Sequence, residues 1–541
     1  MRQSRIVAWR WLIAGVLVFQ LQPSEAADPP SPPTSPPPDA SATQHFDVSE
    51  YRVLGNTVLS DREIEGVLYP RLGESKTLTD VDAARAALEA AYHAAGYATV
   101  FVDVPPQKVD EGIVRLRVTE GRLRNRSISG ARYFSEREIL AQLPATTPGT
   151  VPKISELQQQ LNAVNTQTPD RSVVPILKAG SEPGTTDLAL KVDDHLPLHG
   201  SVDLNNQYTP DTRHLRANFG LSYNNLFQDL DSISLQYTTT PQATGEVGVV
   251  NTGYAFHPID GLRPSISFTN SSSNVATLGT LGVLGKGQVY SARLSAPIAQ
   301  LPGDSQTLTV GLDYKSFRNA ITVASIGEQV EPVSYVNLSL TYSGAWQRFN
   351  ASQAVERVGS LDLTFDAGPR GIANRTSNFG SGALATRGNY AYVRSGGSFS
   401  TRLPADFLLT LRGTGQVALE KLVVYEQESF TGADGVRGYL DAEVLGDTGI
   451  KGSVQLQSMP FSRKGFIFAD GFFFFDAGRS HLIQALPGEP GRTDLRSWGA
   501  GLDLFPGHAV TGSLTWAEPL VSRPRTEAHE YRVLFDLKGS F

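Results

Sequence analysis

The sequence predicts two small α+β domains followed by an all-β transmembrane barrel, with sixteen antiparallel strands as the expected number. Three observations carry this prediction. A pattern of one strand, two helices and two further strands occurs twice between His45 and Asp194, with a constant offset of 75 residues. From about Leu198 onward, apolar and polar residues alternate between Gly, Asn and Asp turns, as in strands with lipid on one face and water on the other. No later segment approaches the roughly eighteen continuous apolar residues that a membrane helix needs, so a helical membrane protein is excluded.

Composition narrows the classes of function. The chain of 541 residues has no Cys, which excludes disulfides, thiolate metal sites and cysteine nucleophiles. Its formal net charge of −7 leaves no basic footprint for nucleic acid. The nine His residues are scattered, and neither an H-E-x-x-H motif nor a Gly-Lys-Ser/Thr phosphate loop is present. The sequence therefore predicts no metal, no cofactor and no enzymatic activity.

The N-terminus is typical of a secretory signal peptide, which we assign to residues 1–26. Three Arg residues form its charged region, residues 11–19 form a short apolar core, and Ser24-Glu25-Ala26 is a small-x-small cleavage site. A membrane anchor helix is the alternative, but the apolar core is too short for one. Residues 27–45 follow as a linker, and its seven prolines favour an extended spacer over a helix.

The two repeats are the predicted α+β domains, residues 46–121 and 122–195. Ser60-x-x-Glu63 and its counterpart Ser135-x-x-Glu138 are both predicted to be capping boxes, in which the hydroxyl and the carboxylate satisfy free N–H groups at a helix start. Second helices are expected over about Thr79–Ala95, with Gly96 as the stop, and over about Ile154–Thr166. The expected strands are Tyr51–Leu54, Thr99–Val104 and Ile113–Thr119 in the first repeat, and Arg126–Ser129, Val173–Leu177 and Leu188–Val192 in the second.

Residues 196–541 form the predicted barrel. Phe219, Leu221 and Tyr223 alternate with polar residues, and the same period of two recurs at Leu361–Phe365. About 340 residues, at roughly twenty for each strand with its loop, leave room for sixteen strands. Tyr and Trp on these strands are interpreted as girdle or core residues. A soluble β-sandwich shows a similar alternation, but the signal peptide and the length without a helix argue against it.

Two stretches in the barrel region are unusual for their place. Arg437 lies within Asp434-Gly435-Val436-Arg437-Gly438-Tyr439, among small residues that permit turns. Asp476 interrupts a run of four Phe, residues 472–475, which otherwise is typical of a membrane-facing strand. A carboxylate beside so much apolar surface needs a partner, because an unpaired buried charge is costly. We predict that a loop tip carrying Arg437 folds into the barrel and meets Asp476 on the inner wall. The alternative is a surface turn with a solvated strand end.

The same stretches resemble the motifs of two-partner secretion transporters, the haemolysin secretion/activation family. Val436, Arg437, Gly438 and Tyr439 are similar to the conserved loop of that family, together with Glu428-Ser429-Phe430 before them and Leu445–Gly449 after them. Phe474, Asp476 and Gly478 are similar to its barrel-strand motif. The resemblance implies that Arg437 and Asp476 pair inside a sixteen-stranded barrel, on an inward-folded loop near residues 430–449.

Two further resemblances extend over the rest of the chain. The repeated unit resembles tandem POTRA domains, which implies that their sheet edges accept an extended client chain. The last strand carries Tyr531, Val533, Phe535 and Leu537 on one face and ends at Phe541, which resembles the C-terminal assembly signal of outer-membrane barrels. Members of the family place a plug helix before a linker like this one, but this chain leaves no room for such a helix.

The resemblance implies a transporter in the outer membrane of a Gram-negative cell, with its POTRA domains in the periplasm. It would recognise an unfolded secreted partner of haemolysin or adhesin type and export it through the barrel. The implied partners are this polypeptide, outer-membrane lipid and the barrel assembly machinery, with a monomer expected and no nucleic acid. An outer-membrane insertase for other barrels is the main alternative, and a porin-type channel is a weaker one.

Overall fold

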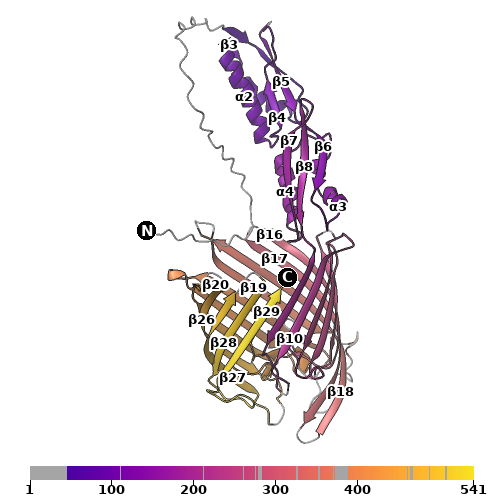
Figure 1. Cartoon of the computed structure of the whole chain (residues 1–541), viewed down its shortest axis with the longest axis vertical. Helices are drawn as coiled ribbons and strands as arrows, with labels where there is room; N and C mark the ends of the chain where they lie inside the picture. The colour runs from indigo at the N-terminus through magenta and orange to yellow at the C-terminus, as the bar shows by residue number, and fades with distance from the viewer. Residues whose placement is uncertain are drawn as a thin grey trace. The chain divides into compact units, whose positions relative to one another are not determined.

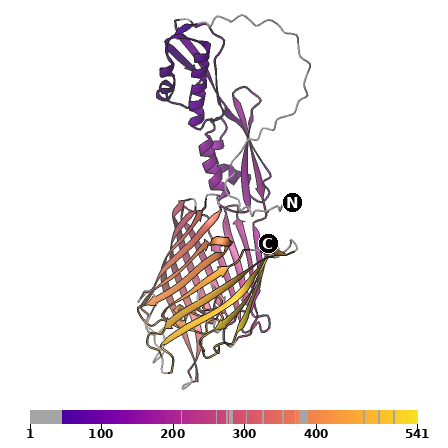
Figure 2. The ribbon, with the colours of Figure 1, turned by 90° about the vertical axis from the view of Figure 1, so that its left-hand side faces the viewer.

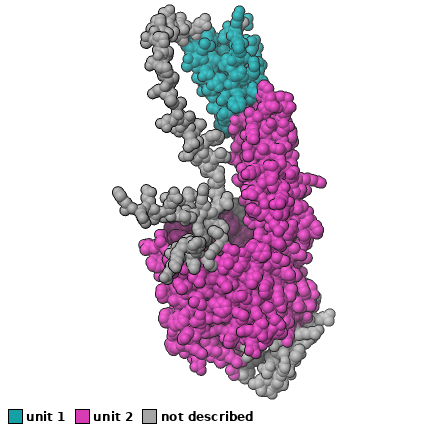
Figure 3. Space-filling view, in the orientation of Figure 1, with its two compact units in different colours: residues 1–94, 100–119 teal, residues 95–99, 120–541 magenta. Residues whose placement is uncertain are grey.

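The computed structural model describes residues 45–541 except 110, 211, 260, 274–275, 278–282, 302, 324–326, 351–353, 370, 372–373, 375–387, 460, 464–466, 486–487 and 506–508. The predicted signal peptide and nearly all of the predicted linker lie outside these residues. The chain divides into two compact units, residues 1–94 with 100–119 and residues 95–99 with 120–541 (Figure 3). None of the described helices is long and apolar enough to cross a membrane.

The first unit is a small α+β domain. Its elements are β1 (Phe46–Val48), β2 (Glu50–Leu54), α1 (Asp61–Leu68), β3 (Gly73–Lys76), α2 (Leu78–Ala94), β4 (Val100–Asp103) and β5 (Ile113–Glu120). The sheet has the order β2-β5-β4, and β2 runs parallel to β5. The predicted capping box at Ser60 and Glu63 is present. The apolar stripe of α2, including Leu88 and Tyr92, is buried in the core, which confirms the predicted helix.

A second α+β domain opens the second unit. Its elements are β6 (Arg122–Ser129), α3 (Glu136–Ala141), α4 (Ile154–Asn165), β7 (Arg171–Ala179) and β8 (Thr185–Asp194), and the sheet has the order β6-β8-β7. Leu157, Leu161 and Val164 of α4 pack against the inner face of this sheet. The repeat seen in the sequence therefore corresponds to a repeated order of helices and strands.

The prediction of a second capping box is wrong. Ser135 precedes α3, but its side chain makes no capping hydrogen bond. Its backbone N–H, which Glu138 was expected to bind, instead donates to Gln228 Oε1 at 2.8 Å. Gln228 lies in the turn that joins the second and third barrel strands, so an acceptor distant in sequence replaces the local one.

The remaining chain forms a closed antiparallel barrel of sixteen strands (Figures 1 and 2). They are β9 (Leu198–Asn205), β10 (Arg216–Leu226), β11 (Asp231–Thr239), β12 (Gly248–Ala255), β13 (Arg263–Ser271), β16 (Gly287–Leu301), β17 (Asp304–Val323), β18 (Gly327–Phe349), β19 (Val355–Gly368), β20 (Tyr390–Arg402), β21 (Leu408–Ala418), β24 (Thr448–Gln457), β26 (Ile467–His481), β27 (Arg492–Phe505), β28 (Val510–Pro519) and β29 (Arg532–Ser540). The short β25 (Phe461–Arg463) pairs with β26 on the same side as β24, so β24 and β25 count as one interrupted strand. Pairing of β29 with β9 closes the ring.

The strands alternate between an apolar outer face and a polar inner face, and this corrects one expectation. The run of four Phe on β26 does not face the membrane as a whole. Phe473 and Phe475 are 66% and 47% exposed on the outside, whereas Phe472 and Phe474 are 4% and 5% exposed and point inward. Two glycines of β27 make room for the inward rings, because a Cβ at Gly499 would lie 2.5 Å from Phe474 Cζ.

The two ends of the barrel can be told apart. The β10–β11 turn contacts the second α+β domain, where Gln228 Nε2 donates to the carbonyl oxygen of Tyr133 at 3.0 Å. Hairpin turns of an antiparallel barrel fall alternately at its two ends. The connection between β21 and β24, residues 419–447, therefore enters from the end opposite this α+β domain.

Candidate functional site

The β21–β24 connection, called here the inward loop (residues 419–447), is folded into the barrel. Its arms pair through β22 (Glu428–Ser429) and β23 (Leu445–Gly446). Phe430, Val436, Tyr439 and Val444 form a buried apolar cluster with Leu495 of the barrel wall. A loop that buries this many apolar side chains against the wall has a defined position in the lumen, and this position sets the geometry of the site.

Arg437 at the loop tip forms an ion pair with Asp476 on the inner face of β26. The Arg437 guanidinium donates from Nε to Asp476 Oδ2 at 2.8 Å and from Nη2 to Oδ1 at 2.9 Å. The backbone N–H of Arg437 donates to Oδ2 at 3.1 Å. The Asp476 side chain is 0% exposed and that of Arg437 is 12% exposed. The contact expected from the sequence is therefore present, as a two-pronged and desolvated pair.

The wall supplies the remaining partners of the guanidinium. Arg437 Nη1 donates to Gln455 Oε1 at 3.1 Å, and Nη2 donates to Ser453 Oγ at 3.0 Å. Ser453 lies opposite Asp476 in the β24–β26 register, and Gln455 lies opposite Phe474. The guanidinium carbon lies 3.4 Å from the centre of the Phe474 ring, a cation–π contact. Neighbouring strands thus present acceptors and an aromatic face to one cation.

Two glycines of the predicted motifs fit the loop to the wall. Gly438 has φ = +93°, a left-handed conformation that side chains disfavour, and a Cβ there would lie 3.3 Å from Pro519 Cδ. A Cβ at Gly478 would lie 3.0 Å from Val436 Cγ2. Gly478 on β26 therefore leaves the space that the buried Val436 side chain occupies.

Tyr439 holds the returning arm of the loop. Its hydroxyl donates to the carbonyl oxygen of Val521 at 2.8 Å, lies 3.1 Å from the carbonyl oxygen of Arg496, and accepts from the N–H of Val521 at 3.3 Å. Asp447, further along the same arm, accepts hydrogen bonds from the backbone N–H groups of Leu422 and Ile483. Tyr439 and Asp447 are both buried. The returning arm is thus held to the barrel by Tyr439 and to the start of the same loop by Asp447.

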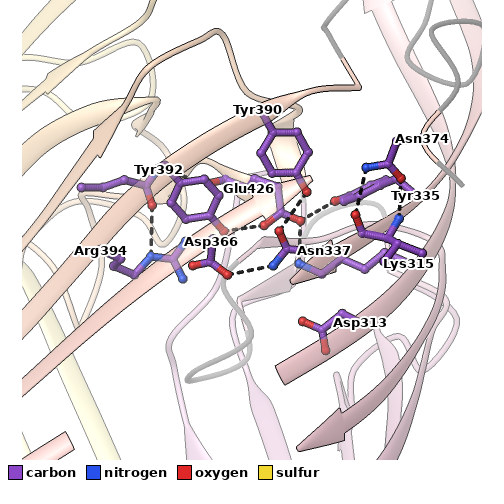
Figure 4. Close-up of polar contacts among 12 residues, drawn as sticks. Asp313, Lys315, Tyr335, Asn337, Asp366, Asn374, Tyr390, Tyr392, Arg394 and Glu426 are labelled. Atoms are coloured by element: carbon purple, nitrogen blue, oxygen red, sulfur yellow. Dashed lines mark hydrogen bonds and ion pairs between the residues drawn. The ribbon is translucent and has the colours of Figure 1, made fainter. Parts of the chain in front are cut away.

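Sequence reasoning missed a second polar centre, around Glu426 (Figure 4). Its carboxylate accepts from Lys315 Nζ at 2.5 Å and from the hydroxyls of Tyr335 at 2.6 Å and Tyr392 at 2.7 Å. Tyr335 and Tyr392 are buried core residues, as expected for tyrosines on these strands, and their hydroxyls also donate to this carboxylate. In the sequence, the only local sign of a role for Glu426 was its position two residues before Glu428 of the loop motif.

The loop also forms part of the wall of a polar cavity of about 860 Å³ inside the barrel. Its loop-side lining includes Glu426, Glu428, Asp434 and Asp441. The barrel side contributes cations and polar groups, among them Arg216, Arg293, Lys315, Arg394, Lys451 and Lys538. A cavity of this composition is a water-compatible lumen rather than an apolar ligand pocket.

Phe541 lies at the seam that closes the barrel. Its backbone exchanges two hydrogen bonds with Gly200, with N···O distances of 3.0 and 3.1 Å. Its ring is exposed on the outer surface. The C-terminal residue is therefore accessible from the membrane side of the seam.

Two family models match the chain. The model of the POTRA domain, ShlB-type, matches residues 46–121, and that of the haemolysin secretion/activation protein ShlB/FhaC/HecB matches residues 184–504. The outer membrane transporter CdiB of Escherichia coli is 24% identical over 514 residues, which cover 90% of this chain and 82% of the relative.

Solved structures share the architecture. CdiB from Escherichia coli superposes with a TM-score of 0.58 at 20% identity, covering 94% of this chain and 93% of that chain. BamA from Haemophilus ducreyi lacking POTRA domains 1–3 gives a TM-score of 0.57 at 15% identity, covering 92% of this chain and 100% of that chain. At these identities the likeness shows the fold alone.

Proposed function

Because the chain belongs to the family of haemolysin secretion/activation proteins ShlB/FhaC/HecB, we propose that it recognises an unfolded secreted partner through its POTRA domains and exports it through its barrel. As a member of that family it is a two-partner secretion transporter, with its barrel in the outer membrane and its POTRA region in the periplasm. The family match favours secretion over an assembly insertase or a porin-type channel. The proposed partner is a large protein of haemolysin or adhesin type.

The observation that supports this mechanism is the anchored inward loop beside a polar lumen. A polypeptide that crosses the barrel must share the lumen with residues 419–447, so the position of the loop determines the width of the path. We propose that the Arg437–Asp476 pair keeps the loop tip in the position that export requires. In this proposal Val436, Gly438, Tyr439, Phe474 and Gly478 fit and support that pair.

The first α+β domain offers a free sheet edge to the partner. On the β4 edge, side chains of α2 already bind the backbone of Val102. Its N–H donates to Glu89 and its carbonyl oxygen accepts from Arg85, so these groups are not available to an added strand. Among the described residues, β2 pairs in the sheet only with β5. Unpaired strand edges accept extended peptides as an added strand. We propose the β2 edge as the site where the partner first binds.

Deleting residues 51–121 tests this role. We expect a barrel that still shifts its electrophoretic mobility on heating, as folded outer-membrane barrels do, but that no longer exports the partner. Deleting residues 29–38 of the Pro-rich linker is the matched control, and we expect it to leave export intact. Normal secretion by the variant that lacks residues 51–121 would show that the first domain is not required to recognise the partner.

The remaining assignments belong to the same proposal. Residues 1–26 are a signal peptide, 27–45 a linker, 46–121 and 122–195 two POTRA domains, and 196–541 the barrel. Phe541 is proposed to be recognised by the barrel assembly machinery, and the outer apolar face of the barrel binds outer-membrane lipid. We propose a monomer without enzymatic activity, cofactor or nucleic-acid partner.

A further inference from the structure

Glu426 is a buried carboxylate of the inward loop, separate from the Arg437–Asp476 pair. It precedes the Arg437 tip by one arm of the inward loop, and its side chain is 2% exposed. It receives one ammonium donor from Lys315 and two phenolic donors from Tyr335 and Tyr392. Figure 4 shows these three side chains converging on Glu426. We call this group of four residues the Glu426 clamp.

The Glu426 clamp holds a different sector of the barrel from the Arg437 site. Lys315, Tyr335 and Tyr392 lie on β17, β18 and β20, whereas the partners of Arg437 lie on β24 and β26. Between the two sites, Glu428 pairs with Arg394 of β20 and with Lys451 of β24. The inward loop is therefore held to the inner wall at separate places, through Glu426, Glu428 and Arg437. Because these contacts involve different strands, one can break while another remains.

An apolar cluster surrounds the clamp. Leu422, Val423 and Tyr425 of the loop pack with Phe317 and Val249 of the wall. The rings of Tyr425 and Phe317 stack with their centres 4.0 Å apart. Further members are Val247, which directly precedes β12, and the strand residues Val289, Tyr335, Tyr390, Tyr392 and Ala418. We call this cluster the apolar seal.

The apolar seal lies at the outer end of the lumen. Val249 is the second residue of β12, Tyr390 is the first residue of β20 and Ala418 is the last residue of β21. These strand ends are all at the barrel end where the inward loop enters, opposite the second α+β domain. The cluster joins the loop to one sector of the wall, from β12 to β21, and this sector offers ions no polar partner where the loop packs against it.

We propose that Glu426 is the latch that holds the apolar seal shut, independently of the Arg437–Asp476 anchor. Glu426 is adjacent in sequence to Tyr425, so the clamp fixes the backbone that carries the main aromatic ring of the seal. Loss of the clamp frees residues 419–427 from β17 and β18, while Glu428 stays paired with Arg394 and the tip stays on β26. This inference rests on the proposed export function and assigns the closed state of that pathway to named residues.

The test is ion conductance of the full-length transporter in planar lipid bilayers, a measurement that needs no partner protein. Glu426→Gln removes the charge at constant size, and Tyr335→Phe combined with Tyr392→Phe removes the two phenolic donors while keeping the charge. We expect both variants to raise the open fraction about tenfold or more, the size expected for losing buried hydrogen bonds to a charged group. Asp434→Asn is the matched control, because Asp434 is an exposed carboxylate of the same loop that also lines the lumen. The conductance of this variant should equal that of the wild type.

A second readout separates the latch from a general loss of structure. The chain has no Cys and Val436 is buried, so Val436→Cys reports release of the loop tip to a membrane-impermeant thiol reagent. When Val436→Cys is combined with Glu426→Gln, the introduced thiol should stay protected, because Arg437 remains anchored. Raised conductance with a protected thiol supports the latch.

Two other outcomes overturn the inference. Wild-type conductance in both clamp variants overturns the latch itself, and rapid labelling of the thiol at position 436 overturns its independence from the anchor. If the wild type does not export a partner, the proposed function fails whatever the conductance, so the two failures can be told apart.

Discussion

Asp476→Asn should release the inward loop, because it removes the counter-ion of Arg437 at nearly constant size. The Asp476 carboxylate is fully buried and receives three hydrogen bonds from Arg437. Removing one partner of a buried pair costs about 3–5 kcal/mol. Arg437 retains Ser453, Gln455 and slight exposure, so the lower figure applies. About 3 kcal/mol corresponds to roughly a 100-fold change in the ratio of released to anchored loop.

Thiol labelling measures this ratio directly. Val436 is 0% exposed, so the thiol of Val436→Cys reacts only when the loop leaves the wall. When opening and closing are fast, the labelling rate follows the open population. We expect this thiol to react about 100-fold faster in the Asp476→Asn background. Asp434→Cys, at an exposed position, is the control and should react equally in both backgrounds. Equal rates at position 436 would refute the view that the ion pair anchors the loop.

Three other predictions concern single residues. Gly438→Ala should reduce export, because φ = +93° disfavours a side chain and the added Cβ would meet Pro519. Gly413→Ala is the control and should export normally, because its Cβ would meet only the carbonyl oxygen of Lys451 at 4.0 Å. Secretion assays of the two variants test this difference. Arg437→Lys keeps the charge but loses the two-pronged geometry, so secretion should fall between those of the wild type and Arg437→Ala, and full secretion would contradict the need for the fork. The N–H and hydroxyl of Thr77 lower the pKa of Asp80. The stability that Asp80 adds is therefore present above its unfolded pKa of about 3.9 and lost as pH falls through the folded value. Asp80→Asn should lower the melting temperature of the helical signal at neutral pH, and this deficit should shrink as the pH falls below about 3.9. A deficit that stays the same as the pH is lowered would contradict this assignment.

The sequence was most informative where structure follows from a local period. Alternation at residues such as Phe219, Leu221 and Tyr223 identified barrel strands, because every second side chain of a strand shares one face. The Arg437–Asp476 contact could be predicted because each residue was out of place in its own surroundings and each satisfies the other. Family resemblance implied the same pairing, which the residues by themselves left open against a surface turn with a solvated strand end.

The errors arose where distant residues compete with local ones. Ser135 has a capping-box sequence, but Gln228 from a barrel turn takes its N–H. The inward direction of Phe472 and Phe474 depends on glycines of the next strand, which the run of four Phe does not indicate. Glu426 binds three side chains from separate strands, so no local pattern marks it as a buried residue.

A charge swap between the loop tip and the wall tests whether export requires the contact between Arg437 and Asp476. Secretion of the partner is measured for Arg437→Asp, for Asp476→Arg and for the double variant, with the heat-dependent mobility shift as the check on folding. Each single variant places two like charges in one confined site, so each should abolish export. The double variant restores opposite charges at the same contact, so its export should lie well above that of either single variant. Strictly additive losses in folded barrels would contradict a functional contact between Arg437 and Asp476.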